Sequence, residues 1–338
     1  MPWQPLNKYC WDFWFVYKEP NLHVFYLQAN RLACAYIAER RHNLSSIGHA
    51  ILTDFGWQES LQDPALARRE GHWDDVSIWT GSIIEKEGCY YMFYTARCSQ
   101  AKFVLTAHER RQPQNIGVAQ SDNLLVWQRT SASKENPIIP NPGLGSEFDG
   151  VSWRDPYVIK DATDGQFYAF ICACPSDAPT DAGGAVAYAI SLDLEDWQTQ
   201  PYRVLYVSPE FYYLEVPQVF WRKQPNCWRL YLLFSPYWNR FFERRDPKGT
   251  YYVRSLPIKD RGQITYDHIP WEQKSATLLS NGLYGGKFAN PEEENPVFFG
   301  FQLEDEAGHF VGGICDPQWA IFNDDGTIGL CNSKPHSN

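Results

Sequence analysis

The sequence predicts an all-β chain that folds as a five-bladed β-propeller, and two repeating features carry that prediction. The first is the pattern Ala-x-Ser-x-Asp/Asn-Leu-x-x-Trp, which spans residues 119–127 and 189–197 with identical spacing and returns in a shorter form at 47–57. The second is an aromatic-rich strand in each of five units, at residues 24–29, 90–96, 167–173, 228–235 and 297–303. Strand-rich repeats of roughly seventy residues are typical of propeller blades rather than of helical solenoids.

Each unit has room for about four short strands. Within the pattern, an alternating strand leads into a turn opened by Asp or Asn, and a tryptophan then returns to the core. The one stretch with helical periodicity is 61–69, for which we expect a short helix. No Gly/Ser-rich linker divides the chain, so residues 1–338 are predicted to form a single catalytic domain.

Composition excludes several classes of function. The net charge of −10 argues against nucleic acid, whose phosphates require a basic face. No run of uncharged apolar residues is long enough to span a membrane. The start of the chain lacks a secretory signal pattern, and nine cysteines without a disulfide-type spacing indicate reduced thiols, so a cytoplasmic location is expected. Most of the 14 Trp, 20 Tyr and 20 Phe should fill the core, although aromatic rings also stack on sugars.

Four short motifs share one phase of the repeat, at or before the first strong strand of successive units. They are 11–14 (Trp-Asp-Phe-Trp), 79–82 (Trp-Thr-Gly-Ser), 153–156 (Trp-Arg-Asp-Pro) and 214–217 (Leu-Glu-Val-Pro). Because the first strand of a propeller blade lines the central channel, side chains in this phase should face one pocket.

Three of those side chains are acidic: Asp12, Asp155 and Glu215. One carboxylate near an anomeric carbon can act as nucleophile or base, while a second carboxyl protonates the leaving oxygen. Each residue alone has a structural explanation, since Asp-Pro is a common turn and Asp12 could end a strand. Glu215 lies between apolar neighbours, where an unpaired Glu is rare. Together and in phase, the three acids favour chemistry on a sugar.

The motifs resemble those of glycoside hydrolase families 68 and 32, the levansucrases and the invertase or fructosidase group. Residues 11–14 are similar to the Trp-Asp-Ser-Trp stretch of levansucrases, and 79–82 to their Trp-Ser-Gly-Ser. Arg-Asp-Pro at 154–156 matches both families. Glu-Val-Pro at 215–217 resembles the Glu-Cys-Pro of family 32, and 47–50 resembles its Gly-His-Ala strand.

The resemblance implies a five-bladed propeller and a retaining mechanism on a β-fructofuranoside or similar small saccharide. Asp12 would be the nucleophile, Asp155 the transition-state stabiliser and Glu215 the acid/base. Substrate contacts would come from Trp11, Trp79, Ser82 and Arg154. The sequence departs from levansucrases around the acid/base, where Tyr213 and Val216 replace the first and last residues of their Glu-x-Glu-Arg.

Two alternatives stay open at this point. One is an inverting enzyme similar to the family 43 arabinofuranosidases and xylosidases, and the other is a non-catalytic sugar-binding propeller. The expected partner is a small-molecule or oligosaccharide substrate, with no cofactor and no transition-metal site. The sugar and its linkage, hydrolysis or transfer, a structural calcium and the oligomeric state are left undetermined by the sequence.

Overall fold

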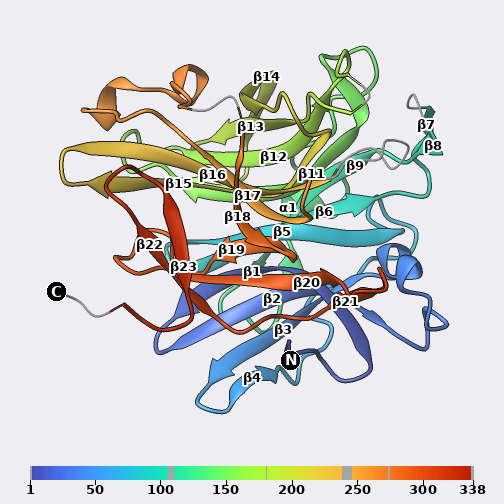
Figure 1. The fold of residues 1–338 in the computed structure, drawn as a ribbon. Coiled ribbons are helices and arrows are strands. Elements are labelled where there is room, and N and C mark those ends of the chain that lie inside the picture. The colour runs from blue at the N-terminus through green and yellow to red at the C-terminus, as the bar shows by residue number, and fades with distance from the viewer. Residues whose placement is uncertain (1, 106–109, 180, 238–245, 273–274, 336–338) are drawn as a thin grey trace.

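The computed structural model describes residues 2–105, 110–179, 181–237, 246–272 and 275–335, and it places five β-sheets around a common centre (Figure 1). The colours of Figure 1 follow the chain around the ring, from the blue first sheet through cyan, green and yellow to the red last one. The predicted five-bladed β-propeller is therefore confirmed.

The strands of each blade follow in chain order from the centre outward, except that β21 of blade five pairs with β20 beside this path. Blade one holds β1 (Lys8–Lys18), β2 (Asn21–Asn30), β3 (Ser46–Thr53) and β4 (Gly56–Glu59); blade two holds β5 (Ser77–Lys86), β6 (Cys89–Arg97), β9 (Gln114–Ser121) and β10 (Gln128–Arg129). Blade three holds β11 (Phe148–Lys160), β12 (Phe167–Pro175), β13 (Ala185–Ser191) and β14 (Trp197–Val207). Blade four holds β15 (Tyr213–Gln224), β16 (Cys227–Tyr237), β17 (Gly249–Arg254) and β18 (Thr277–Asn281); blade five holds β19 (Leu283–Phe288), β20 (Val297–Glu304), β21 (Phe310–Gly312), β22 (Gln318–Phe322) and β23 (Ile328–Cys331).

The remaining elements are short and lie between or beside the blades. They are the β7 (Val104–Leu105) and β8 (Arg110–Arg111) pair, the helix α1 (Ser131–Lys134) and the 3₁₀ helices η1 (Ala38–Asn43), η2 (Arg261–Gln263) and η3 (Tyr266–His268). Within the described ranges, no helix has the length and apolar character needed to cross a bilayer. The first strands β1, β5, β11, β15 and β19 contact one another around the centre, and the five predicted aromatic strands lie in β2, β6, β12, β16 and β20.

The repeated sequence pattern forms the same turn in blades two and three. In blade two, Ser121 Oγ accepts hydrogen bonds from the backbone N–H groups of Asn123 and Leu124, and the indole of Trp127 donates to Leu124 O. Blade three repeats these bonds at the equivalent positions 191, 193, 194 and 197. A short polar side chain that bonds its own backbone two or three residues on ends a strand in this way.

The returning tryptophan of each turn fills the wedge between two blades. Trp127 packs edge-on against Phe25 of blade one, with ring centroids 5.5 Å apart, and Trp197 packs in the same way against Phe93 of blade two at 5.4 Å. Such aromatic pairs add about 0.5–1.5 kcal/mol beyond the area that they bury. The repeat thus explains both the strand ends and the packing between neighbouring blades.

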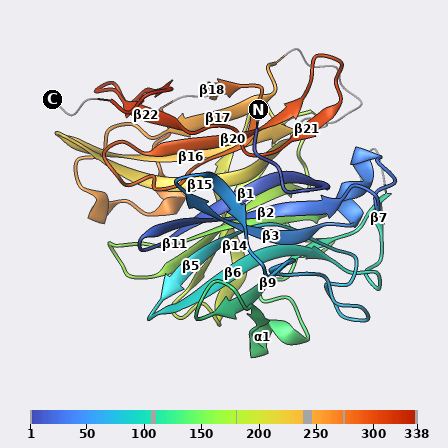
Figure 2. The ribbon, with the colours of Figure 1, turned by 90° about the horizontal axis from the view of Figure 1, so that it is seen from below.

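The ring is closed by backbone pairing between the two ends of the chain. Trp3 N–H donates to Ile314 O at 2.8 Å, and Ile314 N–H donates back to Trp3 O at the same distance. Gly313 N–H also bonds Cys10 O on β1. The orange-to-red last blade accordingly lies next to the blue first one in Figures 1 and 2, with β19 and β21 in contact with β1.

The prediction of a short helix at 61–69 is wrong. The segment is extended at its centre, where Leu66 pairs with Ile47 at the start of β3 through Ile47 N–H to Leu66 O at 2.8 Å. Asp63 accepts hydrogen bonds from Lys8 and Gln28 of the same blade. Backbone pairing with a sheet edge and these tertiary contacts override the local periodicity.

Two histidines pack against each other inside blade one, on β2 and β3. His23 Nδ1 and His49 Nε2 lie 2.9 Å apart, and the His49 ring stacks on Phe25 with centroids 4.4 Å apart. Both histidines are buried. Burial lowers the pKa of His23 and lowers that of His49 to about 3, so the His49 ring stays neutral in the folded protein down to mildly acidic pH.

The folded protein should therefore lose stability as the pH falls below about 6.5, because the unfolded chain takes up protons that the folded chain refuses. From His49 alone the free energy of unfolding should be lower at pH 5 than at pH 7.5 by about 2 kcal/mol. Urea unfolding of wild type and His49→Phe at both pH values measures the difference. If the two proteins lose the same stability between these pH values, the buried imidazole is not the cause.

Candidate active site

Each inner strand carries an irregularity beside its site motif, and β11 has a second one between Phe148 and Trp153. Pairing with the second strand shifts between Trp11 and Phe13, Trp79 and Gly81, Arg154 and Tyr157, Glu215 and Gln218, and Tyr284 and Lys287. A bulge adds a residue to one strand and re-aims its side chains. Asp12, Asp155 and Val216 lie in these bulges with φ values of 31°, 59° and 53°.

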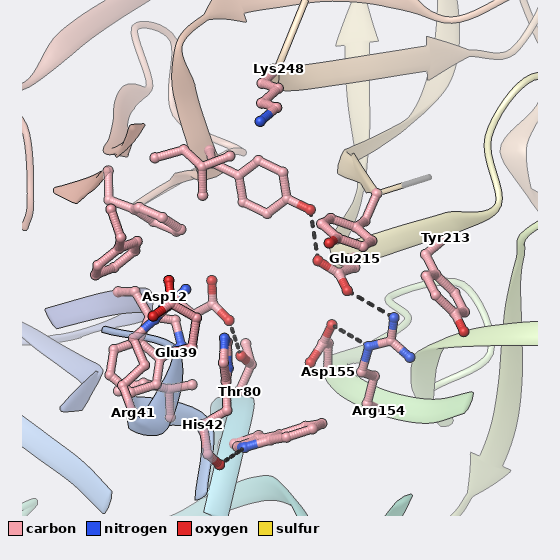
Figure 3. Close-up of a pocket in the computed structure, with 18 of the residues that line it drawn as sticks. Asp12, Glu39, Arg41, His42, Thr80, Arg154, Asp155, Tyr213, Glu215 and Lys248 are labelled. Atoms are coloured by element: carbon pink, nitrogen blue, oxygen red, sulfur yellow. Dashed lines mark hydrogen bonds and ion pairs between the residues drawn. The ribbon is translucent and has the colours of Figure 1, made fainter. Parts of the chain in front are cut away.

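The bulges surround a cavity of about 550 Å³ at the centre of the ring (Figure 3). Asp12, Asp155 and Glu215 all line it, as the shared phase of their motifs predicts. The other predicted residues that line it are Trp11, Trp79 and Arg154. Three blades thus bring their carboxylates to one pocket.

Asp12 is held by the neighbouring blade. Thr80 Oγ1, from the bulge of β5, donates a 2.5 Å hydrogen bond to Asp12 Oδ2. Burial, followed by the negative charge of Asp155, raises the pKa of Asp12 to about 7. The Thr80 hydrogen bond and the positive charge of Arg41 oppose this rise. Thr80 therefore fixes one oxygen of Asp12, and the raised pKa means that this carboxylate takes up a proton more readily than an exposed Asp.

Asp155 is fixed by contacts with the blades on either side. Its backbone N–H donates to Thr95 Oγ1 at 2.8 Å, and its Oδ2 accepts the Val216 N–H at 3.0 Å. Burial raises its pKa to about 6, while Arg154, the Val216 N–H and Lys287 hold it down. These contacts orient Asp155 rigidly and favour its charged form.

Glu215 is more exposed than Asp155, with 24% of its side chain accessible against 5%. Arg154 Nη2 donates to Glu215 Oε1 at 2.8 Å, and Tyr284 Oη donates to Glu215 Oε2 at 2.6 Å. Burial and the Glu215 charge raise the pKa of Tyr284 well above its usual value, so the phenol keeps its proton and remains a donor. Glu215 therefore has two fixed donors and access to the open side of the pocket.

Ser82 does not line the cavity, unlike the other predicted substrate contacts. It is buried, and its Oγ accepts the Val158 N–H of β11 at 3.0 Å. The irregular pairing between Trp79 and Gly81 places Thr80 beside Trp79 on the pocket side instead. Ser82 joins blades two and three, and Thr80 is the polar contact that this motif supplies.

Other pocket residues were not singled out from the sequence. Tyr284 belongs to the inner strand of blade five, and extending the repeat phase to that blade would have found it. Glu39, Arg41 and His42 come from η1, in the connection between β2 and β3, where no repeat pattern exists. Tyr213, noted as a departure from levansucrases, also lines the pocket and lies under the Arg154 guanidinium at 4.3 Å.

The arrangement has the groups that glycosyl transfer requires. A donor-fixed carboxylate, a second carboxylate held by the backbone and a third with solvent access can serve as nucleophile, stabiliser and proton donor. Tryptophans and Arg154 supply flat faces and a fork of donors. Within the described ranges, no group of three or more His, Cys, Asp or Glu side chains is placed to hold a metal ion.

Five blades around one cavity lined by three carboxylates are the arrangement that the motif resemblance implies. The family model of the glycosyl hydrolases family 32 N-terminal domain matches residues 14–309. The chain therefore belongs to glycosyl hydrolase family 32, as its motifs predict. The match begins just after Asp12, whose place in the site rests on the geometry.

Solved structures share the fold at low sequence identity. The inulosucrase from Halalkalicoccus jeotgali bound to kestose has a TM-score of 0.69 and 18% identity, over 99% of this chain and 91% of its own. The sucrose-6-phosphate hydrolase from Lactobacillus gasseri has a TM-score of 0.69 and 16% identity, over 97% of this chain and 62% of its own. The fructan 1-exohydrolase IIa from Cichorium intybus has a TM-score of 0.68 and 16% identity, over 97% and 59%.

One curated relative matches over a shorter stretch. Extracellular endo-alpha-(1->5)-L-arabinanase 2 from Bacillus subtilis (strain 168) is 31% identical over 126 residues, which is 35% of this chain. The chain matches 22% of the length of that relative.

Proposed function

We propose that the protein is a β-fructofuranosidase-type glycoside hydrolase that releases or transfers a fructosyl unit by a retaining double displacement. The observation that carries this proposal is the convergence of Asp12, Asp155 and Glu215 on one cavity in a family 32 chain. Inulosucrase and fructan exohydrolase neighbours support the fructoside as substrate class.

In the first step a carboxylate oxygen of Asp12 attacks the anomeric carbon, and the bond from that carbon to the leaving oxygen breaks. Glu215 gives its proton to the leaving oxygen, and Asp155 stabilises the positive charge that develops on the ring. Arg154 and Tyr284 each donate to one oxygen of Glu215. A protonated carboxyl oxygen keeps acceptor capacity, so it can retain one of these bonds while its O–H donates to the leaving oxygen.

In the second step water or an acceptor hydroxyl attacks the same carbon from the side that the leaving group vacated. Glu215 takes the proton of the attacking oxygen, and Asp12 leaves as a carboxylate. Two inversions give net retention. The Thr80 hydrogen bond to Asp12 Oδ2 persists through both steps and helps the carboxylate to depart.

Incubation of the purified protein with sucrose, kestose and inulin in the presence of methanol tests the proposal. A retaining fructosidase is expected to yield methyl β-fructofuranoside, whose anomeric configuration NMR reads without the mutarotation that scrambles free fructose. Product of the opposite configuration would refute double displacement, and no fructose or fructoside from any of the three sugars would refute the substrate class.

An arabinan-cleaving activity is the second candidate, because of the local identity to the arabinanase. A parallel incubation with linear α-1,5-arabino-oligosaccharides distinguishes the two. The fructosidase proposal requires turnover of at least one fructoside and no shortening of the arabino-oligosaccharides.

A further inference from the structure

A lysine is sealed behind the wall of the active-site pocket. Lys287 follows the bulge of β19, is 2% exposed and is not among the residues that line the cavity. Its Nζ donates to Pro217 O on β15 at 3.1 Å and lies 5.1 Å from the centre of the Tyr157 ring. An ammonium group buried in this way is costly unless opposite charge compensates it.

The compensating charge comes from two of the pocket acids. Burial lowers the pKa of Lys287 to about 8, and the carboxylates of Asp155 and Asp12 counteract the fall. Conversely, the Lys287 charge lowers the pKa of Asp155. At neutral pH the amine is therefore mostly charged. Its acceptor Pro217 directly follows Val216, whose N–H donates to Asp155 Oδ2, so the ammonium is bound to the strand segment that holds this carboxylate.

The other charged and titratable groups around these acids have different roles. Arg154 on β11 is bound to Glu215 at 2.8 Å and stands 3.7 Å from Asp155. Arg41 in η1 lines the cavity near Asp12, where substrate can reach it. Glu215 on β15 repels both aspartates, and Tyr284 on β19 donates to Glu215.

We infer that Lys287 is a positioning residue of the active site, whose enclosed ammonium keeps Asp12 and Asp155 in the charged form while its bond to Pro217 holds the strand beside Val216. The inference rests on the proposed function in one respect, namely that both aspartates work as carboxylates. The further claim is that Lys287, which does not line the cavity and so does not contact the sugar, helps to set the pH range of the reaction.

The test is Lys287→Met, which keeps the length of the side chain and removes the charge. The acidic limb of the kcat/KM profile is expected to move to higher pH by about one unit, because a nearby positive charge no longer favours the carboxylates. At the pH optimum, kcat/KM of Lys287→Met should be close to that of wild type. A loss that is uniform at all pH values, with the limb unmoved, would overturn the inference.

Gln218→Met is the matched control at the same joint. Gln218 bonds both backbone groups of Phe288 on β19, through Nε2 to O and through Oε1 from N–H, each at 2.8 Å, and it carries no charge. This variant should lose stability without moving the acidic limb. Lys287→Arg, which retains the charge, should leave the limb close to that of wild type.

A readout without turnover separates this inference from the proposed function. In protein labelled with ¹³C at aspartate Cγ, Asp12→Asn and Asp155→Asn assign the two signals, and pH titration follows both. Lys287→Met should raise both midpoints, even if no fructoside is ever cleaved. Unchanged midpoints would overturn the inference whatever the substrate proves to be.

Discussion

Replacing Asp12 by Asn is expected to abolish turnover while the protein stays folded and still binds sugar. The amide has the same shape, and its oxygen can still accept the Thr80 hydrogen bond, but it lacks the charge needed to attack an anomeric carbon. The loss in kcat should be on the order of 10⁴-fold, in the range measured for catalytic groups that act as a unit. That corresponds to about 5.5 kcal/mol of transition-state free energy.

Thr80→Val is a milder change that tests the hydrogen bond to Asp12 without removing the carboxylate. It keeps the carboxylate of Asp12 and removes only the donor at 2.5 Å, so activity should fall by about ten- to a hundredfold, the worth of one hydrogen bond to a charged group.

Calorimetric titration of Asp12→Asn with the saccharide that wild type cleaves measures the sugar binding that this variant retains. A variant with a tenth of the wild-type rate would rule out Asp12 as the nucleophile.

Replacing Glu215 by Gln is expected to give an enzyme whose rate depends strongly on the leaving group. With a natural oligosaccharide, which leaves as an alkoxide unless protonated, kcat should fall by about 10²- to 10⁴-fold. With β-fructosyl fluoride the first step needs little protonation and should stay fast. Deglycosylation then limits turnover, so a burst of fluoride should precede a slow steady state.

Azide supplies the check on this assignment. As an anion that needs no general base, it should accelerate the slow phase of Glu215→Gln and form a fructosyl azide, with little effect on wild type. Tyr284→Phe, which removes a 2.6 Å donor to Glu215 but keeps the carboxylate, should slow the natural substrate and fluoride more evenly. An equal loss in kcat/KM, which reports the first step, on both substrates in Glu215→Gln would exclude proton donation by this residue.

The blade architecture could be predicted because the sequence repeats both a turn and its packing. The pattern that ends in Trp127 and Trp197 specifies local hydrogen bonds, and the same tryptophans fill the space between blades. Local and tertiary requirements agree at these positions, so the pattern is readable from sequence. At 61–69 the local and tertiary requirements disagree. The local periodicity favours a helix, but Leu66 pairs with β3, so the predicted helix is not formed.

The acids were predictable because repeat phase determines which strand faces the channel. Which side chains of each motif face the pocket could not be predicted, because the prediction assumes a regular strand, whose side chains alternate between its two faces with period two. Trp79 and Thr80 are consecutive and both line the cavity, which is possible only through the irregular pairing after Trp79. Ser82 therefore lies outside the cavity, whereas Arg154 and Asp155, also consecutive, both line it. The η1 residues lie outside the repeat and have no sequence signal.

The irregularities in the five inner strands constrain how such a pocket can diverge in evolution. A substitution at Thr80 or Tyr284 exchanges one group and leaves the others in place. Deleting the extra residue of a bulge would instead restore regular pairing and remove the local distortion in which Asp12 and Asp155 lie, although the later residues of that strand would keep their partners. Descendants of this chain can therefore acquire new specificity by point changes or by altering the η1 connection, while insertions and deletions in the inner strands should be eliminated by selection.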